Sequence, residues 1–63
     1  MKVEIKFRDN SIFEGITTII DNITEIHYNY ETVLKGKRIA FESDIDGTGC
    51  TYYMEDIEWF EAK

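Results

Sequence analysis

The chain has 63 residues, of which 43% are apolar and 32% charged, and it contains no proline and a single cysteine. A chain of this length forms one domain with a small core, which excludes a second domain and, unless the chain oligomerises, a deep, layered catalytic cleft. The formal net charge of −6 argues against the Lys/Arg-rich surface on which direct nucleic-acid binding depends.

The other compositional signals favour a cytosolic protein. The single cysteine, Cys50, cannot form a disulfide within the chain. The first nine residues alternate apolar and charged side chains, unlike the continuous apolar segment of a secretory signal. No apolar run approaches the roughly 20 residues that a membrane-spanning helix needs. We therefore expect neither export nor membrane insertion.

The N-terminal part of the chain predicts two strands. Residues 3–7 alternate apolar and charged side chains, which is the period of a half-buried strand. A turn is expected at residues 9–11, and the β-branched run at residues 12–20 predicts a second extended segment. Gly15 within this run predicts a bulge or a sharp bend.

The next segment predicts a third strand. After a turn at residues 21–22, residues 24–31 alternate, which places Ile26, Tyr28 and Tyr30 on one face.

A fourth strand is predicted after an ambiguous connection. Residues 31–37 fit either one helical turn or a loop. Residues 37–43 alternate again, and this alternation directs Ile39 and Phe41 inward and Ala40 outward.

The last third of the chain predicts a hairpin turn and two further elements of secondary structure. Residues 44–49 are rich in Asp and Gly and predict a hairpin turn. Residues 51–54 predict a strand, residues 55–57 a tight turn, and residues 58–63 a closing strand or a short helix. The whole pattern predicts a single all-β domain, 1–63. We expect a five- to six-stranded antiparallel SH3-like barrel or curled sheet, with at most one short helical turn.

Two features of the sequence resemble known small proteins. The order of the segments, with a bent second strand and the tight "EDI" turn before the last strand, resembles an SH3-like barrel. The ending "TYYMEDIEWFEA", the bias toward Ile, Lys, Glu, Asn and Tyr, and the absence of proline are similar to small all-β proteins of phages and prophages of Gram-positive bacteria. Many such proteins have no assigned activity, so the resemblance implies a fold and a setting without a chemistry.

The stretch "SDIDGTGCTYYMED" is similar to an EF-hand calcium loop. Asp44, Asp46, Gly49 and Glu55 occupy the positions of three ligands and of the required glycine. The context disagrees, because the preceding residues alternate as a strand and a second loop for pairing is missing. The turn composition favours a plain hairpin, and calcium binding by residues 44–55 is kept as an alternative.

The same stretch also looks like the nucleophile loop of the haloacid-dehalogenase phosphatases. In that resemblance Asp44 would be the nucleophile and Asp46 the acid–base. The chemistry needs a magnesium site, a lysine and a further acidic pair, all placed by a large α/β core. Sixty-three residues cannot supply that core, and we do not expect an enzyme.

His27 and Cys50 are the single histidine and the single cysteine of the chain, which excludes a Cys/His zinc site within one copy. A Cys50–His27 nucleophilic pair would need an orienting group and a pocket, which a small barrel rarely offers. We therefore expect His27 on the surface and Cys50 as a small buried side chain, and we predict no metal and no cofactor.

The negative charge is concentrated toward the C-terminus. Acids and bases balance over residues 1–41, whereas residues 42–63 carry seven acids against Lys63. Trp59 and Phe60 are adjacent, so in a strand they point to opposite faces and one of them lies outside the core. An exposed aromatic side chain among acids is a typical anchor for a protein partner. The residues predicted to bind a partner are Glu55, Asp56, Glu58, Trp59, Phe60 and Glu61.

The predicted function is that of a non-enzymatic protein-interaction module of phage or mobile-element type, whose acidic C-terminal third binds a basic protein partner. Two alternatives stay open. One is a structural protein that self-associates through Trp59 or Phe60 and its edge strands. The other is the calcium-binding loop protein described above. A solvated acidic face that only keeps the protein soluble would give the same charge pattern.

Overall fold

The chain folds into β-strands joined by turns and one short 3-10 segment in a computed structural model that describes residues 1–30, 36–43 and 49–63. This confirms the predicted all-β fold. The ambiguous segment 31–37 and the predicted turn at residues 44–49 lie largely outside the described residues. The elements are β1 (Val3–Phe7), β2 (Thr17–Ile20), β3 (Glu25–Tyr30), β4 (Arg38–Glu42), β5 (Gly49–Tyr53), η1 (Met54–Asp56) and β6 (Ile57–Ala62).

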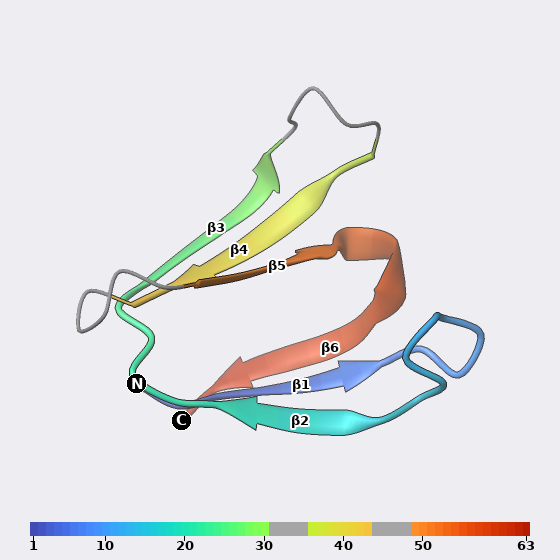
Figure 1. The fold of residues 1–63 in the computed structure, drawn as a ribbon, viewed down its shortest axis with the longest axis horizontal. Helices are drawn as coiled ribbons and strands as arrows, with labels where there is room; N and C mark the ends of the chain where they lie inside the picture. Colours follow the sequence, from blue (N-terminus) through green and yellow to red (C-terminus); the bar gives the residue numbers. More distant parts are fainter. Residues whose placement is uncertain (31–35, 44–48) are drawn as a thin grey trace.

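Within the described residues, six strands form two antiparallel three-stranded sheets rather than one closed barrel (Figure 1). Sheet A has the order β2-β1-β6, and sheet B has the order β3-β4-β5. The chain passes between the sheets twice, from β2 to β3 and from β5 through η1 to β6. Its two ends lie side by side, because β1 and β6 are neighbours and the Lys63 amide donates to the Lys2 carbonyl oxygen at 2.8 Å.

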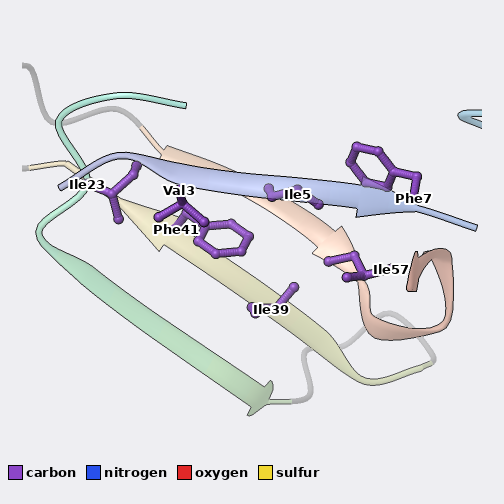
Figure 2. Packing of buried hydrophobic residues seen from close by; sticks show 7 residues of the cluster. All are labelled: Val3, Ile5, Phe7, Ile23, Ile39, Phe41 and Ile57. Atoms are coloured by element: carbon purple, nitrogen blue, oxygen red, sulfur yellow. The ribbon is translucent and has the colours of Figure 1, made fainter. Parts of the chain in front are cut away.

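The core lies between the two sheets. Val3 and Ile5 of β1 and Ile39 and Phe41 of β4 are fully buried, and their side chains fill the space between these two strands (Figure 2). Period-two alternation predicts these four positions correctly, since every second residue of a strand faces the same side. Phe41 also contacts Phe60 of sheet A, with ring centroids 5.6 Å apart in a T-shaped arrangement. Aromatic and β-branched side chains therefore hold the sheets together.

The second strand is shorter than its composition predicts. Extended structure is expected over residues 12–20, but β2 begins at Thr17 because residues 12–15 form a tight turn. Gly15 has a φ of +77°, a left-handed conformation that glycine adopts without a steric penalty. A Cβ atom at this position would collide with the carboxylate of Asp9. The predicted bend at Gly15 is thus confirmed, and the predicted extension of the strand before Thr17 is wrong.

Lys6 closes this loop from the neighbouring strand. Its Nζ atom donates to the carbonyl oxygen of Gly15 at 2.7 Å and to that of Phe7 at 3.0 Å. The carboxylate of Asp9 lies 3.4 Å from the same atom. The ammonium group therefore ties the turn to the end of β1 through backbone carbonyls on both sides of the loop.

Ala40 is buried although the alternation of β4 predicts it outside the core. It does lie on the outer face of sheet B, where its cross-strand neighbours are His27 and Thr51. Only 6% of its surface is exposed, because a small side chain on a central strand is covered by larger neighbours on both sides. The alternation predicts the face correctly and the exposure wrongly.

Candidate interaction surface

A β-bulge in β6 decides which aromatic side chain faces solvent. Ile57 and Trp59 pair with consecutive residues of β1, so Glu58 is an extra residue in this ladder. Strict alternation from the buried Ile57 would turn Trp59 inward. The extra residue shifts the alternation by one position, which directs Phe60 inward and Trp59 outward. Trp59 is 44% exposed, and the prediction that one of the two aromatics lies outside the core is confirmed.

Trp59 belongs to the outer face of sheet A, the side turned away from the core. It pairs with Lys6, and the next outward pair along the same two strands is Glu61 with Glu4. Across β1, Glu4 also pairs with Ile19 of β2, which is 55% exposed. The outer face therefore combines two exposed apolar side chains with charged residues of both signs.

Two lysines lie among the acids of this face. Lys63 Nζ lies 2.9 Å from Glu4 Oε1, and Lys6 Nζ lies 3.8 Å from Glu58 Oε2. The hydrogen bond to Glu4 raises the pKa of Lys63, with further contributions from the charges of Glu4 and Glu61. The excess of acid in the C-terminal third of the sequence thus does not produce a uniformly acidic face on sheet A, because β6 lies against the lysine-bearing strand β1.

The remaining predicted partner-binding residues are separated from this face. Glu55 is exposed in η1, before the strand begins, and Asp56 is half-buried beside it. The carbonyl oxygen of Asp56 accepts a hydrogen bond of 2.8 Å from the Arg8 amide. Phe60 is half-buried and packs against the core. The structure therefore brings Glu58, Trp59 and Glu61 together.

A second cluster, which the sequence analysis missed, lies on the outer face of sheet B. Glu25 of β3 pairs directly with Glu42 of β4. His27 Nε2 lies 2.9 Å from Glu25 Oε2 and 3.5 Å from Glu42 Oε2. The alternation of β3 indicates that Glu25 and His27 share a face. The register of β3 against β4, which brings in Glu42, has no signal in the sequence.

The Cys50–His27 pair that the sequence analysis argued against does not form, because the two residues lie on opposite faces of sheet B. Cys50 pairs with the buried Phe41, whereas His27 pairs with Ala40 on the outer face. His27 is exposed as predicted, and Cys50 is half-buried. Burial raises the pKa of Tyr52, and the neighbouring Cys50 raises it further through its charge and a hydrogen bond. Cys50 and Tyr52 therefore belong to the lining of the core.

Calcium binding by residues 44–55 stays an alternative. Asp44 and Asp46 lie outside the described residues, and Glu55 is exposed. Across the described ranges there is no helix with the length and apolar character needed to cross a membrane.

Comparisons with known proteins do not assign the chain to a family. It matches no protein-family model, no curated protein and no solved structure. The proposals below therefore depend on the residues and their geometry.

Proposed function

We propose that the chain is a non-enzymatic protein-interaction module whose binding surface is centred on Trp59, with Glu58 and Glu61 beside it. The observation that carries this proposal is the bulge in β6, which turns a large aromatic side chain out of the core of a very small protein. Bulges on edge strands commonly serve to redirect a side chain. Exposed tryptophans are also among the residues that contribute most to binding at protein interfaces.

The charges around Trp59 favour a partner segment that carries Arg or Lys. A guanidinium or ammonium group stacks favourably on an indole ring, and the flanking carboxylates attract the same group. Lys6 offsets part of the charge of Glu58, because its Nζ atom lies 3.8 Å from Glu58 Oε2. Its shorter contacts, of 2.7 and 3.0 Å, are hydrogen bonds to two loop carbonyls, and the half-exposed Glu58 side chain stays within reach of a partner's cation.

The proposal includes an SH3-like arrangement of the strands and a phage or prophage setting. The strand order of the two sheets and the position of η1 between β5 and β6 support the first. The second depends on the resemblance of the sequence. A binding role fits the separation of Cys50 and His27, which lie on opposite faces of their sheet and cannot act as a nucleophile and its base.

The fluorescence of Trp59 tests the proposal directly, because it is the single tryptophan of the chain. The chain is titrated with a short peptide of alternating Arg and Gly, and with a matched peptide of Glu and Gly. We expect a saturable change in the emission of Trp59 with the arginine peptide, and a weaker effect at higher salt because exposed charges are screened.

Charge-reversed variants provide the control. The double variant Glu58→Lys and Glu61→Lys should bind the arginine peptide about 30-fold more weakly, since each reversal turns a surface attraction of about 0.5 kcal/mol into a comparable repulsion and the pair therefore loses about 2 kcal/mol. The double variant Glu14→Lys and Asp21→Lys changes the net charge equally at exposed positions outside β6 and should bind normally. Equal binding by both double variants would contradict the proposal.

Self-association is a second candidate function, and the composition of β2 favours it. This strand lies at the edge of sheet A and consists of two threonines and two isoleucines, without a charge or a proline. Natural edge strands usually carry such residues to prevent pairing with another chain. Ile19 within this strand is 55% exposed, and Ile16 just before the strand is 53% exposed. A second copy could extend sheet A through β2.

A further inference from the structure

Three potential metal ligands converge on the outer face of sheet B. The nearest ligand atoms of Glu25, His27 and Glu42 all lie within 4.8 Å of one another. The imidazole Nε2 is 2.9 Å from one carboxylate and 3.5 Å from the other. A tetrahedral Zn²⁺ ion with bonds of about 2.1 Å holds its ligand atoms about 3.4 Å apart. The two imidazole–carboxylate distances lie close to that value, and the two carboxylates, within 4.8 Å of each other, would move closer together on binding the ion.

The backbone fixes the origin of all three side chains. The half-buried Ile26 and the buried Phe41 pair across the strands and face the core, which turns the flanking Glu25, His27 and Glu42 outward. The end of β4 is held by the Thr24 amide, which donates to the Glu42 carbonyl oxygen at 2.8 Å. Only exposed side-chain rotations are then needed to complete a coordination shell.

The register places two like charges directly opposite each other. Glu25 and Glu42 form a cross-strand pair, and like charges in such a pair destabilise a sheet. A cation between them removes this repulsion. On the other side of Glu42, β5 presents Gly49, so no cross-strand side chain competes for the Glu42 carboxylate there.

We propose that Glu25, His27 and Glu42 form a binding site for a divalent transition-metal ion of the Zn²⁺ class. The mixed set of one imidazole and two carboxylates selects such ions over Ca²⁺, which takes six to eight oxygen ligands. Carboxylates complete the set without a second histidine or a cysteine. The single histidine and single cysteine of the chain, which exclude a Cys/His zinc site, therefore do not exclude this one. Three protein ligands leave a coordination position for water or for a side chain of another molecule.

A Zn²⁺ titration of the untagged 63-residue chain tests this site. His27 is the single histidine, so its ring proton signals in the NMR spectrum report on the site without ambiguity. We expect these signals to shift or broaden and to saturate at one Zn²⁺ per chain, with no comparable change when Ca²⁺ is added. Calorimetry of the same titration gives the affinity.

Ligand variants show whether the three residues act together. Glu25→Gln, Glu42→Gln and His27→Asn should each bind Zn²⁺ at least about tenfold more weakly, the lower limit seen for the loss of an outer-shell partner. Glu58→Gln and Glu61→Gln, on sheet A, should bind as the wild type does. All five positions are exposed, and the dispersion of each variant's spectrum confirms that it is folded.

Two outcomes would overturn the proposal. The first is Zn²⁺ binding that leaves the His27 ring signals unchanged. The second is an affinity of the His27→Asn variant equal to that of the wild type. Either outcome assigns bound metal to other groups, and a preference for Ca²⁺ over Zn²⁺ would point to residues 44–55.

Discussion

Tyr52 places an ionisable hydroxyl group at the edge of the core. Its ring lies 5.1 Å from that of Phe7 and 5.6 Å from that of Phe13, both in edge-on arrangements. Burial raises the pKa of its hydroxyl above 10.0, and the adjacent Cys50 adds to this effect. The folded state therefore favours the neutral phenol more strongly than the unfolded chain does.

This shift predicts a specific loss of stability in base. A raised pKa in the folded state contributes stability that is present below pH 10.0 and is lost as the pH rises through the raised value. Urea unfolding at increasing pH should show a steeper loss above about pH 10 for the wild type than for Tyr52→Phe, which lacks this titration. Tyr28→Phe, at an exposed ring, should follow the wild type. Identical pH profiles for the wild type and Tyr52→Phe would contradict the prediction.

At the scale of the element, β2 and β6 are the two edges of sheet A, and their chemistry differs. β6 carries Glu58 and Glu61 and a bulge, all of which discourage pairing with another strand. β2 carries neither a charge nor a bulge in its pairing with β1. If the second candidate function holds, copies of the chain associate through β2.

Sedimentation equilibrium tests this association. The average mass of the wild type should rise above the 7.4 kDa of one chain as its concentration is increased. Ile19→Lys introduces a charge into β2 and should keep the protein monomeric. Ile12→Lys makes the same change at a more exposed position in the preceding turn, outside the strand, and should associate as the wild type does. A wild-type mass that is independent of concentration would exclude self-association through β2.

The elements themselves show how far the sequence predicts this fold. Alternation correctly predicts the strands and their inward residues, such as Ile5 and Phe41, because burial on one face leaves a period of two in the sequence. It does not predict the bulge at Glu58, since an extra residue in a ladder depends on backbone pairing rather than on residue type. The β-branched residues before Thr17 also favour a strand locally, but Gly15 and its contacts impose a turn.

The sequence also predicts the two candidate sites, the Trp59 surface and the Glu25–His27–Glu42 cluster, to different extents. The adjacency of Trp59 and Phe60 predicts an exposed aromatic, and only the bulge identifies it as Trp59. Glu25 and Glu42 are far apart in the sequence and meet through the register of β3 and β4. Such register depends on turns and packing across the whole sheet, which a local pattern does not contain.

At the scale of the whole molecule, stability depends on a few side chains that connect the two sheets. Phe41 is fully buried on β4, and its ring contacts Phe60 of sheet A and Tyr52 of its own sheet. A domain of this length has a free energy of unfolding of roughly 3–9 kcal/mol, at about 0.05–0.15 kcal/mol per residue. Loss of a single large core side chain is therefore comparable with the total.

Phe41→Ala should remove most of the stability. Truncation of a buried phenylalanine costs about 3–5 kcal/mol, because the apolar contacts are lost and a cavity remains. We expect a substantial fraction of this variant to be unfolded in water, before any denaturant is added. Phe41→Leu keeps part of the contact and should give a measurable but lowered midpoint. Trp59→Ala also removes a large aromatic side chain, but from an exposed position. It should change the free energy of unfolding by less than about 1 kcal/mol, as surface substitutions usually do. Equal denaturation midpoints for Phe41→Leu and the wild type would show that the sheets are not held together through this ring. A large loss of unfolding free energy in Trp59→Ala would show that the indole supports the fold and is not free for a partner.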